Sequence, residues 1–136
     1  MKRIFSLFII ALVLNMVWEN LHSFLYESYR GGSITEFILV RASLFDALII
    51  VIILVPFLYV SFLRKRTWLI VVIGTIVAIM NEWYGLSTGR WLYSPYMPIV
   101  PMLEVGLTPM LQLGLLGYLS FQIQGYLSSE HGTIGS

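Results

Sequence analysis

Five ionisable side chains of this chain combine residue types that transfer protons with surroundings that are otherwise apolar. They are Glu19, His22, Asp46, Glu82 and Glu104. A carboxyl group in an apolar setting can hold a proton near neutral pH, which suits a general acid, and an imidazole beside it can accept or relay that proton. We therefore predict acid–base chemistry at these five residues. For Glu82 and Glu104, a structural role in closing a helix bundle is the alternative.

A second set of polar and aromatic side chains is predicted to contact a substrate. The set is Trp18, Arg41, Asn81, Trp83, Arg90, Trp91, Tyr93 and Gln112. Aromatic faces attract a cationic intermediate and also cover an apolar ligand. For Arg41 the predicted partner is a carboxylate of another helix, Glu82 or Glu19. The alternative for the tryptophans and tyrosines is an ordinary aromatic belt at a membrane surface.

The spacing Glu19-x-x-His22 also occurs where four-helix di-iron proteins present metal ligands. Those proteins use two such pairs, whereas this chain has one, and its other histidine, His131, stands near the C-terminus. A metal at Glu19 and His22, with the other three carboxylates as further ligands, is thus the alternative to a hydrogen-bonded pair. No other cofactor is predicted, because the chain lacks cysteine and carries no phosphate-binding or dinucleotide-binding motif.

The surrounding sequence is that of an integral membrane protein. Of its 136 residues, 58% are hydrophobic and only 11% are charged, against about 25% charged in soluble domains. The mean hydropathy is +0.85. A formal net charge of +1 offers no broad basic surface, so nucleic-acid binding is not predicted.

Four apolar stretches approach or exceed the roughly 20 residues that a helix needs to cross a bilayer. We predict an all-α fold, a four-helix transmembrane bundle that forms one domain over residues 1–127 and ends in a frayed polar tail, 128–136. The predicted helices are about 4–26, 34–63, 68–84 and 110–127. No small-x-small cleavage site follows the first, so we expect a retained span rather than a signal peptide.

Residues 85–108 are predicted to form a long outer loop between the third and fourth helices. Their three prolines oppose a continuous helix, and their aromatic residues favour a membrane surface. Connections of this length are commonly lids or binding loops. This one is predicted either to cover the site or to dip into the membrane and return. Thr108 and Pro109 then predict a helix start, as N-cap and first-turn proline.

The basic residues indicate an orientation. Lys2 and Arg3 precede the first predicted span, and Arg64-Lys65-Arg66 joins the second to the third. With alternating spans both clusters lie on one side, which the positive-inside rule assigns to the cytoplasm. We therefore predict a multi-pass protein of the cell membrane with both termini cytoplasmic. The predicted site residues then share the outer half of the bilayer, where a buried charge is costly and points to pairing or function.

Much of the chain resembles, in outline, a family of small bacterial four-span integral membrane proteins. The likeness rests on Trp18-Glu19 with Leu25-Tyr26, and on Glu82-Trp83 … Trp91-x-Tyr93-Ser94-x-x-Met97-Pro98-x-x-Pro101 … Gly106-Leu107-x-Pro109-x-Leu111-Gln112. That family has no established activity. The resemblance therefore implies an architecture and names no catalytic residue.

A looser likeness concerns enzymes of isoprenoid chemistry. Glu82, Gly85, Thr88-Gly89 and Tyr93 are similar to the acid-glycine-threonine-glycine-tyrosine run of membrane carotenoid hydratases, which add water across an isoprenoid double bond. This chain is shorter and differs in its prolines. Emopamil-binding-type sterol isomerases offer an analogy without a sequence match, since they also use buried acid, histidine and aromatics. Both comparisons imply protonation of an alkene in the membrane.

The predicted function is acid–base chemistry on a lipid-soluble, isoprenoid-like substrate in an outward-facing pocket. One alternative is binding or transport of a small ligand or cation by the same cluster, with protonation as the coupling step. Another is an accessory subunit whose polar groups hydrogen-bond helices to one another or to a partner. Membrane lipid is the expected partner, and a homo-oligomer or a complex with a partner subunit fits the same observations.

Overall fold

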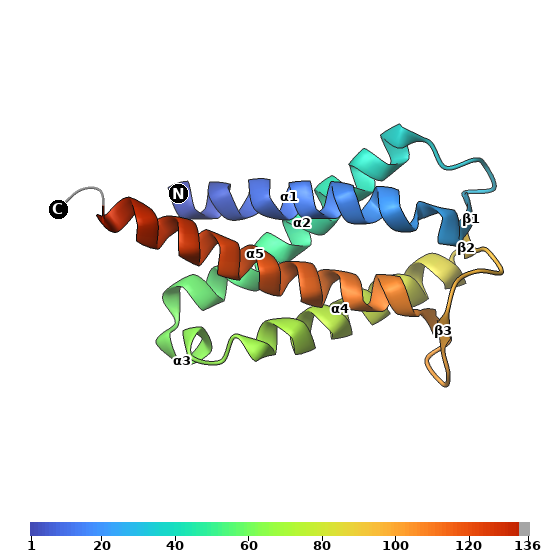
Figure 1. Ribbon diagram of the computed structural model, residues 1–136. Helices are drawn as coiled ribbons and strands as arrows, with labels where there is room; N and C mark the ends of the chain where they lie inside the picture. Colours follow the sequence, from blue (N-terminus) through green and yellow to red (C-terminus); the bar gives the residue numbers. More distant parts are fainter. Residues whose placement is uncertain (134–136) are drawn as a thin grey trace.

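The computed structural model describes residues 1–133, and most of them are helical, as predicted (Figure 1). The long helices are α1 (Lys2–His22), α2 (Glu36–Tyr59), α4 (Trp68–Ser87) and α5 (Leu107–Thr133). The short helical segments are η1 (Ser23–Leu25) and α3 (Ser61–Arg64). Short strands occupy the connections: β1 (Tyr26–Tyr29), β2 (Trp91–Tyr93), β3 (Ile99–Val100) and β4 (Val105–Gly106).

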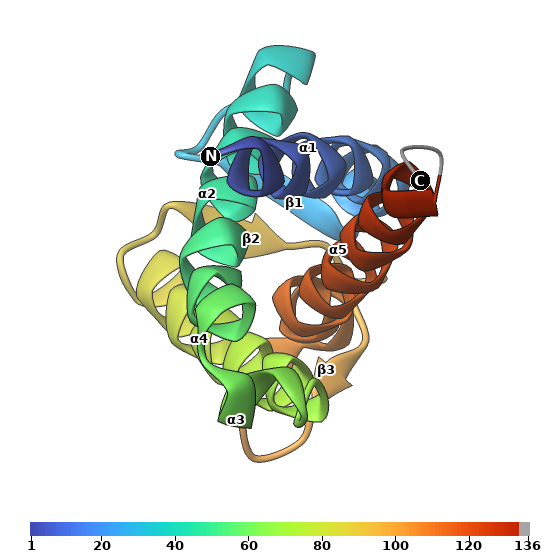
Figure 2. The same ribbon diagram turned by 90° about the vertical axis from the view of Figure 1, so that its left-hand side faces the viewer.

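The long helices lie side by side, in the order α1, α2, α4 and α5 around the molecule (Figure 2). Their shared core is aliphatic and aromatic. Its fully buried members include Leu7 from α1, Ile50 and Phe57 from α2, and Ile70 from α4. The start of α1, the end of α5 and α3 lie at one end of the molecule, and the strands lie at the other (Figure 1). The polar strand end is where the predicted site residues gather.

The helices α4 and α5 approach each other at two glycines. A methyl group at Gly74 would overlap the Cα atom of Gly114, and one at Gly114 would stand 2.6 Å from the carbonyl oxygen of Val71. Gly114 therefore allows the close approach of α4. Small residues bring helix backbones together in this way where lipid, rather than water, surrounds them.

The outer surfaces of the helices are apolar too, as membrane-spanning segments require. Of the described residues, three segments are long and apolar enough to cross a membrane: Lys2–Leu25, α2 and α4. Large apolar side chains such as Phe5, Ile52 and Ile76 are more than half exposed on them. Length and composition thus support three of the four predicted spans. The helix α5 is long enough but contains three glutamines and is not among them.

Helix boundaries differ from the prediction at both ends of the chain. The first helix ends at His22, because the chain from Tyr26 enters a strand. The last begins at Leu107 and continues to Thr133, so residues 128–133 of the predicted frayed tail are helical. Residues 134–136 lie outside the described part.

The middle helices also differ from their predicted bounds. The predicted helix 34–63 is interrupted at Val60, one turn after Pro56, and α3 follows as a separate turn. The third runs to Ser87 rather than to residue 84.

The predicted irregular loop, 85–108, is partly ordered by strand pairing. β2 pairs antiparallel with β1, with Trp91 opposite Tyr29, and β3 pairs with β4. The first pairing joins two connections that are far apart in the sequence. It forms a small cap over the strand end of the helices (Figure 1). Pro109 lies in the first turn of α5, as predicted, whereas Thr108 lies inside the helix instead of capping it.

Candidate functional site

One amide group, that of Gln112, joins polar residues of three helices. Its Nε2 atom donates to Asn15 Oδ1 at 2.9 Å, to Glu19 Oε1 at 2.7 Å and to Asp46 Oδ2 at 2.9 Å. All four side chains are buried. An amide nitrogen carries two protons, so three acceptors can be satisfied only if they share those protons or if a carboxyl group carries another.

Helical spacing explains how α1 contributes to this network. Asn15, Glu19 and His22 follow at steps of four and three, which places them on one face of the helix. That face is buried, whereas Val13 and Val17 on another face are exposed. In a bilayer this arrangement is favourable, because the polar groups find protein partners and the apolar ones meet lipid.

His22 continues the network toward α5. Its Nε2 lies 3.4 Å from Glu19 Oε2, and its Nδ1 lies 3.2 Å from the Thr108 hydroxyl oxygen. The Thr108 hydroxyl in turn donates to the sulfur of Met97 at 3.6 Å. The imidazole therefore stands between a carboxylate and a hydroxyl group, and its tautomer determines which of its two nitrogens donates.

A second group of hydrogen bonds surrounds Glu82. Its carboxylate accepts from the hydroxyl of Tyr93 at 2.5 Å, from Trp91 Nε1 at 3.1 Å and from the hydroxyl of Tyr26 at 3.3 Å. Tyr93 also accepts from the backbone N–H of Gly106 at 2.9 Å. Three donors from the β1–β2 pair thus meet one carboxylate of α4, which fastens the cap to the helices.

The two tyrosines of this group remain donors at neutral pH. Burial, and next the neighbouring Glu82, raises the pKa of Tyr26 well above its usual range, and the same two causes raise the pKa of Tyr93. Both phenols therefore keep their protons under physiological conditions. Glu82 is accordingly held as an acceptor by groups that do not ionise.

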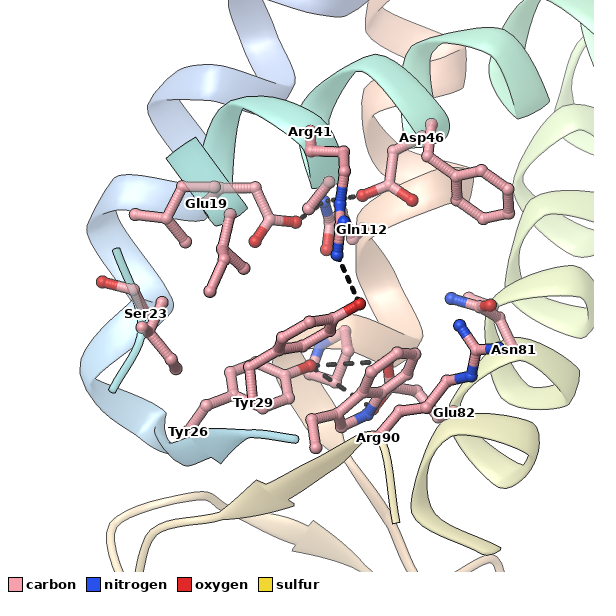
Figure 3. A pocket seen from close by; sticks show the side chains of 18 of the residues that line it. Glu19, Ser23, Tyr26, Tyr29, Arg41, Asp46, Asn81, Glu82, Arg90 and Gln112 are labelled. Atoms are coloured by element: carbon pink, nitrogen blue, oxygen red, sulfur yellow. Dashed lines mark hydrogen bonds between the residues drawn. The ribbon is translucent and has the colours of Figure 1, made fainter. Parts of the chain in front are cut away.

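Between the two groups lies a cavity of about 380 Å³. In Figure 3, Glu19, Asp46 and Gln112 meet on one side of it, with Tyr26 and Glu82 on the other. Apolar side chains of α2, such as Ile38 and Phe45, complete the wall. The cavity therefore combines buried carboxyl groups with an apolar surface.

The cavity brings together most of the predicted site residues. Those that line it are Glu19, Arg41, Asp46, Asn81, Glu82, Arg90, Trp91 and Gln112. Tyr93 does not line the cavity but donates a hydrogen bond to Glu82, which does. Trp18 and His22 line a neighbouring apolar cavity of about 270 Å³ instead. The ring of Trp18 stands 5.8 Å from that of His22, and its indole Nε1 is buried with no hydrogen-bond partner in the described part of the chain.

Besides Tyr93, two predicted site residues lie outside both cavities. Glu104 is exposed in the turn between β3 and β4, where its φ is +58°. Trp83 is half exposed and donates its Nε1–H to the carbonyl oxygen of Leu103 at 2.8 Å. Trp83 thus anchors the β3–β4 turn to α4, and the structure places neither residue where a ligand in the cavity would meet it.

Arg41 has a different partner from the predicted one. Its Nη2 donates to the hydroxyl of Tyr29 at 2.5 Å. Within residues 1–133, Arg41 forms no salt bridge with Glu19 or with Glu82.

Sequence reasoning also missed contributors to the site. Tyr29 and Arg30 line the cavity, but no local pattern marks them, because β1 reaches the site only by pairing with β2. Asn15 had a signal, since it stands four residues before Glu19 in an apolar helix.

A metal site at Glu19 and His22 finds no additional ligands in the described region. Within residues 1–133, no three or more histidine, cysteine, aspartate or glutamate side chains are grouped so as to hold a metal ion. Glu19 and His22 are in hydrogen-bonding contact, which Gln112 extends at Glu19 and Thr108 extends at His22.

Comparison of the chain with protein-family models, with characterised proteins and with solved structures finds no match.

Proposed function

We propose that the protein crosses the membrane four times with both termini in the cytoplasm, and that its cavity carries out acid–base chemistry on a lipid-soluble molecule. The apolar exposed surfaces of α1, α2 and α4 support the membrane location. The fourth span would be α5, which packs along α4 and α1 and exposes Leu111, Leu115 and Leu119. The cavity is lined by residues of β1 and of the end of α4, which lie at the end of the molecule opposite α3 (Figure 1). It would then open at the outer side, away from the basic residues Arg64, Lys65 and Arg66.

The observation that carries the chemical proposal is the sharing of the Gln112 amide by Glu19 and Asp46. Two carboxyl groups that accept from the same nitrogen are close neighbours, and the state in which they share one proton is the most favourable. The protonated group then acts as the acid and the ionised group as the base. They belong to two different helices and line the same cavity as the apolar residues of α2. A substrate double bond or hydroxyl group in the cavity would meet the shared proton, and His22 would exchange it with Glu19.

This assignment changes the predicted roles of the other carboxylates. Glu82 lines the cavity, but its oxygens already accept from Tyr26, Trp91 and Tyr93. It is a positioning residue in this proposal. Glu104 has no role in the chemistry, because it is exposed in the β3–β4 turn.

The test replaces the shared carboxyl groups by amides of nearly the same shape. Cells that express the wild-type chain should differ in their isoprenoid lipids, measured by mass spectrometry, from cells that lack the protein. The variants Asp46→Asn and Glu19→Gln should abolish that difference. Each variant lowers the rate by two or more orders of magnitude, as loss of a general acid does. Glu27→Gln is the matched control, since Glu27 is exposed and does not line the cavity.

The outcome that contradicts the enzyme proposal is an identical lipid profile in cells with the wild type and with a folded Asp46→Asn variant. Three oxygen acceptors converge on one nitrogen at Gln112, an arrangement that also suits a small cation or an amine. Uptake by proteoliposomes that depends on a proton gradient and is lost in Asp46→Asn would therefore indicate a carrier. A fixed partner in mild detergent, without either activity, would indicate an accessory subunit.

A further inference from the structure

Three arginines, Arg30, Arg41 and Arg90, line the same cavity. The guanidinium groups of Arg41 and Arg30 both stand over the ring of Tyr29, at 5.3 Å and 5.6 Å from its centroid. The backbone N–H of Arg30 donates to the carbonyl oxygen of Arg90 at 2.6 Å, which places these two residues side by side. The three arginines, which line one cavity, are called here the arginine rim.

Within residues 1–133, no carboxylate forms a salt bridge with an arginine of the arginine rim. The rim side chains contact aromatic groups: the hydroxyl and ring of Tyr29, and the ring of Tyr84, whose centroid is 5.1 Å from the Arg90 guanidinium. A guanidinium has five N–H donors, and such contacts use few of them. The rest are available to a ligand.

Local backbone geometry does not account for an arginine at position 30. Arg30 and Gly31 have φ values of +50° and +77°. The flanking residues, Tyr29 and Gly32, exchange two backbone hydrogen bonds of 3.0 Å. Two central residues with positive φ are typical of a type I′ hairpin turn, which favours asparagine and glycine. An arginine in this conformation is less stable than those by about 1 kcal/mol, so its presence points to its side chain.

We propose that the arginine rim binds the oxyanion head group, a phosphate or a carboxylate, of an amphiphilic molecule. Guanidinium groups bind such oxygens in pairs through their planar N–H donors. The apolar part of the molecule lies along Ile34, Ile38 and Phe45, which line the same cavity. The inference rests on the proposed function and supplies its substrate class, since an anionic head at the rim directs an apolar segment toward Glu19 and Asp46 (Figure 3).

The experiment measures binding without turnover. The protein is placed in phosphatidylcholine nanodiscs and titrated with farnesyl monophosphate, with farnesol and with inorganic phosphate, using calorimetry. The wild type should bind farnesyl monophosphate at least roughly tenfold more tightly than farnesol. Arg30→Asn and Arg41→Gln should each remove most of that difference and leave the affinity for farnesol unchanged.

Two controls separate binding from folding. Arg30→Asn places a residue that favours positive φ in the turn, so its melting temperature should equal or exceed that of the wild type. Loss of binding in that variant cannot then result from unfolding. Arg64→Gln, in α3 at the other end of the molecule, should bind farnesyl monophosphate like the wild type.

Equal affinities for farnesyl monophosphate and farnesol, or unchanged binding in both rim variants, would overturn the inference. If inorganic phosphate binds as tightly as farnesyl monophosphate, the inference that the ligand is amphiphilic is contradicted. If phosphatidylglycerol added to the nanodisc weakens the binding of farnesyl monophosphate, the arginine rim binds the head group of a bilayer lipid. If it does not, the rim binds a separate amphiphilic molecule.

The result is distinguishable from that of the proposed function. If cells with the Asp46→Asn variant and cells with the wild type have the same lipid profile while the wild type still prefers farnesyl monophosphate to farnesol, the proposed acid–base function is contradicted and head-group binding by the arginine rim is supported. If Asp46→Asn abolishes the change in lipid profile but the wild type shows no such preference, head-group binding is contradicted and the acid–base function is supported.

Discussion

Two buried glutamates show how the surroundings of a residue decide its role. Glu82 accepts hydrogen bonds from an indole and two phenols, all of fixed position in the β1–β2 cap. Glu19 instead shares a single amide with a second carboxyl group and meets an imidazole. Both sequence contexts are apolar with aromatic neighbours. Only the partners, most of which come from other elements, distinguish an anchoring carboxylate from one suited to proton transfer.

Replacing Glu82 by methionine should therefore destabilise the fold more than it alters the chemistry. Both acceptor oxygens are lost, and the Trp91 Nε1–H, which can only donate, is left without its acceptor. We expect a loss of about 1–3 kcal/mol in the free energy of unfolding, the usual effect of an unsatisfied buried donor. Thermal unfolding in detergent measures it, with Glu104→Gln as the exposed control within about 0.5 kcal/mol of the wild type. Equal stability of the two variants would refute the anchoring role.

At the same scale, the sequence predicted the residue types of the site better than their partners. Spacing placed Glu19 and His22 on one face, and the structure confirms that pairing. Gln112 was predicted to touch a substrate, yet its nitrogen joins α1 and α2 to α5. The relative rotation of packed helices decides such contacts, and a single sequence does not encode it in any local pattern.

Among the elements, α4 and α5 approach each other closely at Gly74 and Gly114. Gly74→Ala should push the two helices apart and destabilise the protein by about 1–3 kcal/mol, as overpacking does. Gly125→Ala is the matched control in α5, because nothing lies within 4 Å of the added methyl group. That variant should be neutral or more stable by up to about 1 kcal/mol, since alanine favours helix. The free energy of unfolding of both variants, measured in the same detergent, shows whether helix packing or helix propensity determines the effect of the added methyl group.

The short strands were the elements that sequence reasoning could not predict. β2 has three residues, and β3 and β4 have two each, which is too short for an alternating pattern. β2 pairs with β1 from a distant part of the chain. The prolines correctly excluded a helix over residues 88–106. They carried no information about which segment would supply the pairing partner.

For the whole molecule, the proposed orientation is testable by chemical labelling, because the chain has no cysteine of its own. In intact spheroplasts, a membrane-impermeant maleimide should label a Tyr96→Cys variant at the strand end. It should not label Lys65→Cys or His131→Cys until the membrane is permeabilised. All three positions are exposed on the protein. Labelling of His131→Cys in intact spheroplasts would show that α5 does not cross the membrane.

The Gln112 amide also sets an order of events during synthesis. Gln112 follows Glu19 by 93 residues and Asp46 by 66. At the usual translation rate of about 5–20 residues per second, Gln112 is synthesised roughly 5 to 20 seconds after Glu19. During that time Glu19 and Asp46 have no amide donor from α5, and deep insertion of their segments in lipid is disfavoured. If α1 and α2 cross the membrane as proposed, they reach their final depth only when the C-terminal third of the chain has left the ribosome.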